Sequence, residues 1–420
     1  MTGDRKAAAE TVIARCRKLA TLTEEPGRTT RTFLSPLMRD VHREIAAWLE
    51  PLGAEIKIDA AGNFRAIYSA KETNAPRLLI GSHLDTVPDA GCFDGILGVV
   101  LGVALLETLH GDHLPFAIEL LGFSEEEGVR FGAPFIGSRA VVGTLDEDLL
   151  SREDKRGITV RRAIEDFGLR PGEIPDARLM GEILGYLEFH IEQGPVLDEL
   201  GLPLAAVEAI VGQSRLELTF IGRANHAGTT PMHSRQDAIA GAAEWIAMVE
   251  KEGRRVSGLV ATVGKIDAKP GARNVIAGEA TVTLDVRHRD DEIRVRAVHE
   301  LVRQAEEIAK RRRLSLRRGA ELSQPSVAMD PQLVAQIEDA IRKAGCEPHR
   351  MVSGAGHDAM ILAEKFPAAM IFVRSPLGIS HSPEENVTVE DVEKAIGAGA
   401  NLLEQLASSL DLSKKRVLRA

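Results

Sequence analysis

The chain has 420 residues, a formal net charge of −10 and 44% hydrophobic residues, a composition typical of a globular protein with more than one domain. The acidic balance and the low aromatic content of 4% argue against nucleic acid as a partner, because phosphate binding needs a basic surface. Three scattered cysteines exclude a disulfide framework, and no apolar run is long enough to span a membrane. The first residues lack the apolar core of a secretory signal, so we expect a cytoplasmic protein without a membrane partner.

The first part of the chain predicts two helices, a hairpin and a buried strand that leads into a polar loop. His83 and Asp85 stand where this strand ends, and Asp94 stands where the next apolar helix begins. In open α/β sheets the chemistry lies at the carboxyl ends of the strands, so these residues are candidates for a functional site. The predicted elements are the helices 6–20, 38–52 and 96–109, the hairpin 55–68 and the strand 78–80.

Two further apolar runs, 115–123 and 184–190, predict strands that also end in polar residues. The first runs directly into three adjacent carboxylates that would repel one another on a surface, so a nearby cation is the better explanation for them. Adjacent side chains on extended backbone point to opposite sides, which lets Glu126 and Glu127 do different jobs. The second run ends at His190, a third candidate at a strand end.

The pattern of predicted elements changes after residue 212. The following elements have the order β-α-β-β-α-β, typical of an inserted α/β sandwich. Helix 327–345, strand 368–373 and helix 388–406 come after the insertion, and His381 lies in the loop that follows the strand. The inserted elements are expected at 214–220, 237–249, 258–266, 280–286, 293–308 and 314–317.

The strand-end residues share one chemistry, since imidazole and carboxylate together suit zinc or a similar divalent metal. Two metals bridged by one carboxylate would use five such ligands, and Asp94 is the natural bridge. A metal pair lowers the pKa of a water and stabilises an oxyanion, and an adjacent carboxylate can act as general base. The candidates are His83, Asp94, Glu126 or Glu127, His190 and His381.

Seven short motifs resemble those of the M20 family of dinuclear metallohydrolases, within it the branch of allantoate amidohydrolases and N-carbamoyl-L-amino-acid hydrolases. The resemblance extends over nearly the whole chain, and the motifs together are highly specific. They are GSHLDTV at 81–87, GCFDGILG at 91–98, SEEEGVRF at 124–131, HIEQGP at 190–195, NHAGTTPM at 225–232, GAGHDA at 354–359 and ISHSP at 379–383.

The resemblance implies an α/β protein with a mixed-sheet, metallopeptidase-like catalytic domain at 1–212 and 325–420, and an inserted α/β-sandwich lid and dimerisation domain at 213–324. It implies two divalent metal ions per subunit. Zinc or manganese fits, and cobalt or nickel could also occupy the sites. Glu126 is implied as the general base and Asp85 as the residue that orients His83. The implied metal ligands are His83, Asp94 as the bridge, Glu127, His190 and His381.

The same resemblance implies the substrate contacts. His226 would reach the active site of a partner subunit in a homodimer and stabilise the tetrahedral oxyanion there. Asn274 and Arg287 would hold a substrate carboxylate, for which a guanidinium is well suited. Gln193 would contact a ureido group, and Gly356 could offer a backbone group to the substrate.

We therefore expect an enzyme that hydrolyses the C–N bond of a ureido group in a small carboxylate-bearing molecule. Allantoate, with release of ammonia and carbon dioxide in purine catabolism, is the first substrate candidate, and an N-carbamoyl-L-amino acid is the alternative. Two other classes stay open: a dinuclear dipeptidase or aminopeptidase of the same broad fold, and a binding protein that has lost catalysis. The set of ligands with Glu126 disfavours the second of these.

Overall fold

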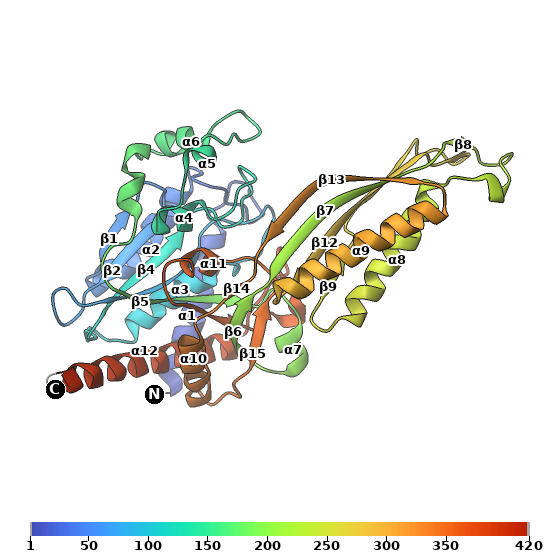
Figure 1. Ribbon diagram of the computed structural model, residues 1–420. Helices are drawn as coiled ribbons and strands as arrows, with labels where there is room; N and C mark the ends of the chain where they lie inside the picture. Colours follow the sequence, from blue (N-terminus) through green and yellow to red (C-terminus); the bar gives the residue numbers. More distant parts are fainter. Residues whose placement is uncertain (1, 418–420) are drawn as a thin grey trace. The chain divides into compact units, whose positions relative to one another are not determined.

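The computed structural model describes residues 2–417, which form two compact units. The first unit contains the described residues up to Glu208 and those from Met329 onward, and the second is formed by Ala209–Ala328. The predicted α/β class with a mixed sheet is confirmed (Figure 1). Among the described residues, no helix is both long and apolar enough to cross a membrane.

The first unit is built on a mixed sheet with the strand order β1-β2-β4-β3-β5-β16-β6, in which β15 also pairs with β6. Strands β4, β3, β5 and β16 are parallel to one another, whereas β1, β2 and β6 join antiparallel. The carboxyl ends of the four parallel strands therefore lie along one edge. The strands are β1 (Glu55–Ile58), β2 (Phe64–Tyr68), β3 (Arg77–His83), β4 (Ala117–Phe123), β5 (Ile183–Ile191), β6 (Leu204–Ile210), β15 (Arg350–Ser353) and β16 (Ala368–Val373).

Helix α3 (Ile96–Glu107) is buried on all sides, because it packs on β3, β4 and β5 and is covered by α1 and α12. This burial accounts for its apolar sequence. Helix α10 packs on α12, and α11 lies against β5 and β16 with α4 beside it. The other helices of this unit are α1 (Thr2–Ala20), α2 (Met38–Leu49), η1 (Glu50–Leu52), α4 (Ile136–Val142), α5 (Glu147–Leu150), α6 (Val160–Asp166), η2 (Pro171–Ala177), α7 (Val196–Leu200), α10 (Pro331–Lys343), α11 (Asp358–Leu362), η4 (Pro376–Gly378) and α12 (Val389–Val417).

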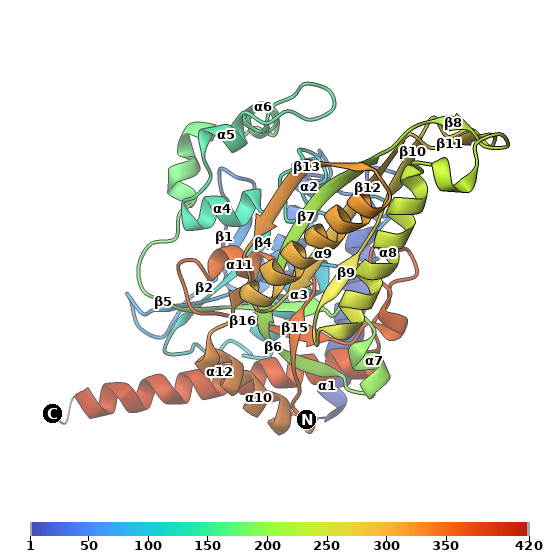
Figure 2. The same cartoon turned by 45° about the vertical axis from the view of Figure 1, so that its right-hand side comes forward.

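The second unit is an antiparallel sheet with the order β10-β12-β7-β13, with β9 also pairing with β12, and helices α8 and α9 pack side by side on it (Figure 2). Trp245 and Phe220 lie in its apolar core. A separate two-stranded pair joins β8 to β11. The elements are β7 (Gly212–Ile221), β8 (Asn225–His226), η3 (Met232–Ser234), α8 (Ala238–Arg255), β9 (Val260–Thr262), β10 (Ile266–Lys269), β11 (Val275–Ile276), β12 (Glu279–His288), α9 (Asp291–Arg311), β13 (Ser315–Gln324) and β14 (Val327–Ala328).

Some elements differ from the expectation. The single strand predicted at 258–266 is two short strands, β9 and β10, which both pair with β12 and are separated by the residues around Gly264. Strand β13 extends to Gln324 although its sequence is polar, because it pairs along β7 over nearly its whole length. Strand β6 was not predicted, and it pairs antiparallel with β16.

Candidate functional site

The site forms where the parallel strands of the first unit end. His83 is the last residue of β3 and lies opposite Phe123, the last residue of β4. His190 lies near the end of β5, opposite Phe372 of β16. Because these strands are parallel neighbours, the loops that follow them emerge at the same edge of the sheet. The carboxylates after β4 and the loop carrying His381 after β16 therefore come together with the two histidines.

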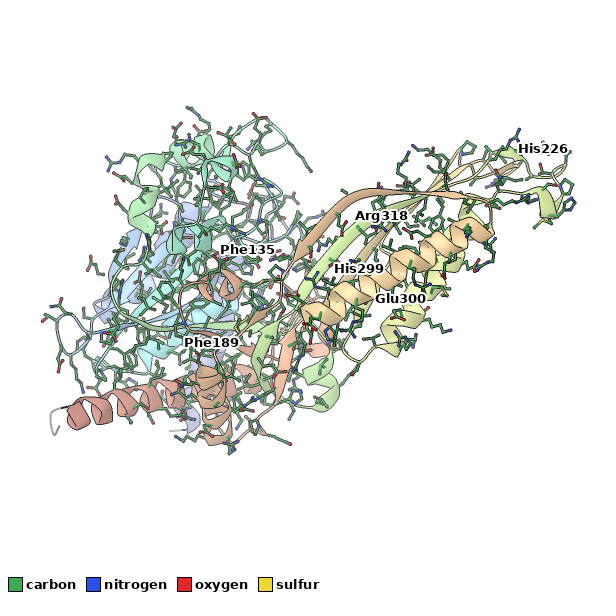
Figure 3. All side chains as sticks on the ribbon, viewed as in Figure 1. Phe135, Phe189, His226, His299, Glu300 and Arg318 are labelled. Atoms are coloured by element: carbon green, nitrogen blue, oxygen red, sulfur yellow. The ribbon has the colours of Figure 1, made fainter. Side chains whose placement is uncertain are left out.

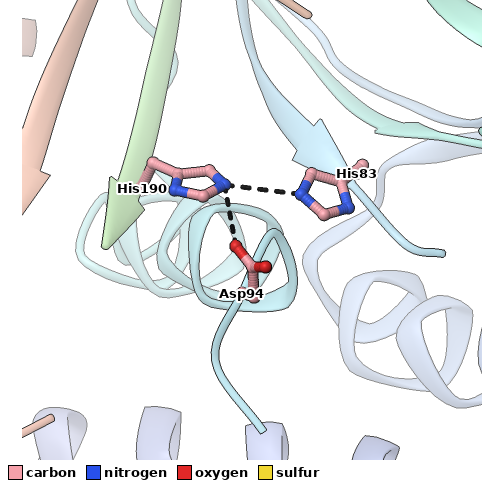
Figure 4. Close-up of side chains that lie close together, drawn as sticks. All are labelled: His83, Asp94 and His190. Carbon is pink, nitrogen blue, oxygen red and sulfur yellow. Dashed lines mark hydrogen bonds and ion pairs between the residues drawn. The ribbon is translucent and has the colours of Figure 1, made fainter. Parts of the chain in front are cut away.

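His83 and His190 face each other through their Nε2 atoms, which lie 3.4 Å apart (Figure 4). The Nδ1 atom of His83 lies 3.0 Å from the main-chain oxygen of Asp85, and that of His190 lies 2.9 Å from the main-chain oxygen of Ile191. A carbonyl oxygen can only accept, so each Nδ1 carries the proton and each Nε2 presents a lone pair. Two lone pairs that face each other at this distance repel unless a cation lies between them.

The distance of 3.4 Å between the Nε2 atoms of His83 and His190 fits a metal ion bound by both. Two nitrogen ligands at about 2.0–2.1 Å from a tetrahedral zinc lie about 3.3 Å apart. The Oδ1 atom of Asp94 lies 3.3 Å from Nε2 of His190, so it completes a buried group of three potential ligand atoms. Burial also lowers the pKa of His190 to about 4, which keeps its imidazole neutral and able to coordinate at neutral pH.

A second group shares Asp94 with the first. The Oδ2 atom of Asp94 is buried and accepts no hydrogen bond, yet it lies 3.1 Å from Nε2 of His381. The same His381 nitrogen lies 3.5 Å from Oε1 of Glu127. Asp94 thus offers one oxygen to each group, which is the arrangement required of a bridging carboxylate. His381 has a left-handed backbone with φ of 54°, a strained conformation of the kind found at functional sites.

Asp85 organises the two glutamates that follow β4. Its Oδ1 accepts the backbone N–H of Glu126 at 3.0 Å and its Oδ2 accepts that of Glu127 at 3.1 Å. The side chain of Asp85 therefore fixes the Glu126–Glu127 peptide, while its main-chain oxygen holds His83. The side chains of Glu126, Glu127 and His83 come close enough to form a further potential ligand group.

The two glutamates have unusual acidity. Burial raises the pKa of Glu126 well above its ordinary value, and the neighbouring carboxylate of Glu127 raises it further, against the opposing effect of His83. Burial and the charge of Asp94 raise the pKa of Glu127 to about 7. Both carboxyl groups are therefore placed where a positive charge would stabilise their ionised forms.

Gln193 also belongs to this group of residues. Its Nε2 donates to Oδ1 of Asp94 at 3.0 Å, whereas its Oε1 is buried without a hydrogen-bond partner. Its backbone N–H donates to the hydroxyl of Ser375 at 3.2 Å. Gly356 directly precedes His357, whose ring packs against that of His190, and a Cβ atom added at Gly356 would lie 3.1 Å from Cζ of Phe135.

The remaining predicted site residues belong to the second unit. His226 lies on the exposed β8 strand at one end of this unit (Figure 3), directly opposite Val275 of β11. The main-chain oxygen of Asn274 accepts the N–H of Ala227, so Asn274 lies next to His226. Arg287 lies on β12, where its Nε and Nη2 donate to the two oxygens of Asp285 at 2.9 and 3.0 Å.

Two buried residues beside the histidines were not singled out as site residues by the sequence. The ring of His357 packs edge-on against that of His190, with centroids 4.5 Å apart. Glu188 accepts the N–H of Ala359 at 2.9 Å and the hydroxyl of Ser82 at 3.2 Å. It forms a further potential ligand group with His190 and His357. Glu188 precedes His190 by two residues on β5, so the strand alternation alone places both side chains on one face.

Two convergent groups of histidine and carboxylate side chains, with a further carboxylate beside them, could hold metal ions, an arrangement typical of metal-dependent hydrolases. The family model described as Peptidase family M20/M25/M40 matches residues 79–405, which include every candidate ligand of the first unit. The chain therefore belongs to this family, as its motifs indicated.

Relatives in the family are similar along nearly the whole chain. Allantoate deiminase of Arabidopsis thaliana is 37% identical, over 95% of this chain and 82% of its own. The N-carbamoyl-L-amino acid amidohydrolase of Geobacillus stearothermophilus is 39% identical, over 93% of this chain and 96% of its own. The crystal structure of an amidase of the hydantoinase/carbamoylase family from Burkholderia multivorans has a TM-score of 0.88 at 32% identity, covering 94% of this chain and 97% of its own.

Proposed function

We propose that the protein is a metal-dependent amidohydrolase that cleaves the C–N bond of a ureido group in a small carboxylate-bearing molecule, with allantoate as the first candidate substrate. The observation that carries this proposal is the pair of ligand groups that share Asp94, with the Glu126 carboxyl group beside them. The names of the relatives support the ureido group as the bond that is attacked.

The residues fit two divalent cations. His83, His190 and Oδ1 of Asp94 would hold one, and His381, Glu127 and Oδ2 of Asp94 would hold the other. This mixture of nitrogen and oxygen donors suits zinc or manganese, and cobalt or nickel can also be bound by such a set. When bound, the cations supply Lewis-acid polarisation of the ureido carbonyl and lower the pKa of the attacking water.

The chain itself supplies the proton transfers. The Glu126 carboxylate takes a proton from the water as the oxygen adds to the ureido carbon. The protonated Glu126 then delivers this proton to the leaving nitrogen as the C–N bond breaks. The products are an amine and carbamic acid, which decomposes to ammonia and carbon dioxide. Burial of Glu126 supports this role, because a raised pKa makes its conjugate base a stronger proton acceptor.

Gln193 is suited to bind the ureido group. Its Oε1 is a buried acceptor without a donor among the described residues, and a ureido N–H would satisfy it. The neighbouring side chains of Ser375 and Ser380 are also polar. A polar lining favours allantoate, which carries two ureido groups, over carbamoyl derivatives of apolar amino acids. The alternative, an N-carbamoyl-L-amino acid, is favoured by the 39% identity to the amidohydrolase that is named for this class.

We further propose that residues 213–324 form the lid and dimerisation domain, and that His226 of one subunit acts at the site of the other. The Nδ1 atom of His226 accepts the N–H groups of Gly228 and Thr229 at 3.1 and 3.2 Å. The proton of the neutral ring therefore lies on Nε2, where it can be donated to an oxyanion. Asn274 and Arg287 would bind the substrate carboxylate, and Gly356 would offer its backbone. The cytoplasmic location stays a prediction.

The test measures turnover by the metal-loaded protein for three classes of substrate side by side. Ammonia release is followed with allantoate and with a panel of N-carbamoyl-L-amino acids. Amino acid release is followed with free-amine dipeptides. We expect allantoate to give the highest kcat/KM. A preference for one carbamoyl amino acid would replace allantoate as the substrate and keep the mechanism. Turnover of dipeptides alone would contradict the ureido proposal.

A further inference from the structure

Glu385 is buried in the loop that carries His381, where it contacts the loop that carries Asp94. Its side chain belongs to the segment between β16 and α12, four residues after His381, and the residue is 4% exposed. Its Oε1 accepts the backbone N–H groups of Phe93 and Asp94 at 2.8 and 3.0 Å. Its Oε2 accepts the hydroxyl of Ser380 at 3.2 Å. One carboxyl group therefore joins the peptide of Asp94 to the residue that precedes His381.

The contact is closely fitted. Gly91 lies against Glu385, and a Cβ atom added at this glycine would overlap the side chain of Glu385. The two loops are about 290 residues apart in the sequence, so their spacing depends on tertiary contacts of this kind. One oxygen of the side chain accepts both N–H groups, so a single group fixes two consecutive backbone positions of the Asp94 loop.

Asp94 and His381, which lie beside these contacts, need accurate placement to bind the cations. Asp94 can serve both ligand groups only if its two oxygens face His190 and His381, which they do at 3.3 and 3.1 Å. His381 is half-exposed and has a strained backbone, so it depends on its neighbours for its position. The hydroxyl of Ser380 also lies 3.4 Å from Nε2 of Gln193, which links the same contact to the residue proposed to bind the ureido group.

We propose that Glu385 is a positioning residue that holds Asp94 and His381 at the spacing at which both bind the same pair of cations. The inference rests on the proposed function, because it takes Asp94 and His381 as ligands. Glu385 touches neither the substrate nor the cations, and it acts through the backbone of Asp94 and the hydroxyl of Ser380.

The test compares metal binding by Glu385→Ala, Glu385→Gln and the matched control Glu384→Ala, whose glutamate is exposed and next to Glu385 in the chain. Zinc is titrated calorimetrically into each metal-free protein, and the visible spectrum of each cobalt-loaded form is recorded. We expect Glu385→Ala to bind zinc at least about tenfold more weakly, the usual effect of losing a group that orients ligands. Glu385→Gln should remain close to the wild type, because its amide oxygen accepts both N–H groups and its amide nitrogen can donate to Ser380.

A second variant covers the case in which Glu385→Ala does not fold. Ser380→Ala keeps the buried carboxyl group and its two backbone contacts, and removes the hydrogen bond between Ser380 and Glu385 together with the longer contact of Ser380 with Gln193. It should weaken zinc binding by a smaller factor and change the cobalt spectrum, with the unfolding free energy of the metal-free protein little changed.

The inference would be overturned if Glu385→Ala bound zinc with wild-type affinity, or if Glu385→Ala and Glu385→Gln lost equal zinc affinity. Equal losses would mean that the charge matters and the hydrogen-bonded geometry does not. If Glu385→Ala cannot be folded, an unchanged zinc affinity and cobalt spectrum in Ser380→Ala would overturn it. A wild type that binds two zinc ions but releases no ammonia would contradict the proposed function and leave this inference standing. A wild type that binds no metal would overturn both.

Discussion

At the scale of single residues, the site depends on where each imidazole places its proton. His83 and His190 donate from Nδ1 to the main-chain oxygens of Asp85 and Ile191. Both acceptors belong to the backbone within two residues of the histidine itself, Ile191 in β5 and Asp85 in the loop after β3, so the local backbone fixes the tautomer. The Nε2 lone pairs then face one another 3.4 Å apart, an arrangement that a cation stabilises.

The proposed role of Glu126 as general base gives a direct prediction. Glu126→Gln has nearly the same shape and keeps the backbone N–H that Asp85 accepts, so the site should keep its structure. Turnover should fall by about 10²–10⁴-fold, the usual contribution of general acid–base catalysis, while metal content measured by atomic absorption stays at the wild-type level. Retained turnover would contradict the role of Glu126.

His42 predicts a pH dependence of stability that is independent of catalysis. It is buried against Phe64 and Phe167, and its Nε2 has no hydrogen-bond partner. Burial lowers its pKa to about 4 from the ordinary value of 6.5. As the pH falls below 6.5 the unfolded chain binds a proton that the folded chain does not bind until about 4, so stability is lost across this window.

His42→Leu should remove this part of the pH dependence. Between about pH 7 and pH 5, the unfolding free energy of the wild type should fall by about 2 kcal/mol more than that of the variant. Urea unfolding of both proteins at the two pH values measures the difference, and other titrating groups cancel because they are common to both. Parallel curves would show that the burial of His42 does not affect stability in this way.

The sequence predicted the candidate ligands at this scale because each one follows an apolar strand. His83, Asp94, His190 and His381 were identified in this way, and the structure brings them together. The contact of His357 with His190 and the hydrogen bonds of Glu385 to residues 93 and 94 were not predicted. These contacts join distant parts of the chain, and no local pattern encodes them.

At the scale of elements, helix α3 packs closely on the strands that carry His83 and His190. Gly98, near its first turn, lies against the strands that carry the two histidines. A Cβ atom at Gly98 would overlap the main-chain oxygen of Phe189 and lie 2.7 Å from Cβ of Ser82. Phe189 and Ser82 directly precede His190 and His83, and α3 itself begins two residues after Asp94. The close approach of helix and sheet therefore holds the first ligand group together.

Gly98→Ala should consequently destabilise the fold and weaken metal binding. Added volume in a well-packed core costs about 1–3 kcal/mol of unfolding free energy. The matched control is Gly172→Ala, at an exposed glycine where an added Cβ meets nothing within 4 Å and the backbone is not left-handed. Urea unfolding of the metal-free proteins and zinc titration check both effects. Equal stability of the two variants would show that the close packing at Gly98 is unimportant.

The elements show which parts of the fold are readable from sequence. The continuous apolar runs of β3, β4 and β16 and the all-apolar α3 were predicted because a strand or helix that is buried on all sides leaves a clear pattern. Strand β13 was predicted too short, because its mostly polar residues 318–324 carry no such pattern and owe their conformation to pairing with β7. Tertiary pairing decides strands of this kind.

At the scale of the whole molecule, the residues proposed for one reaction lie in two units. The ligand groups and Glu126 belong to the first unit, whereas His226, Asn274 and Arg287 belong to the second. His226 lies on an exposed strand at one end of its unit (Figure 3). In the proposed homodimer, a residue on such a strand would act at the site of the other subunit.

Mixing two inactive variants tests this arrangement. In a mixed dimer of Glu126→Gln and His226→Ala, one of the two sites would combine an intact Glu126 with an intact His226 of the partner subunit. Random re-association of equal amounts should therefore restore about one quarter of the wild-type activity, since half the dimers are mixed. Native mass spectrometry confirms that mixed dimers have formed. Mixed dimers without activity would contradict the sharing of His226 between subunits.

The most direct test of the account is a metal titration of catalysis itself. Metal-free protein is supplied with increasing zinc or manganese, and ammonia release from allantoate and from N-carbamoyl-L-amino acids is followed at each step. The account predicts no ammonia without metal and a rate that rises until about two metal ions are bound per chain. Full activity without metal, or no ammonia from any ureido substrate with two ions bound, would contradict it.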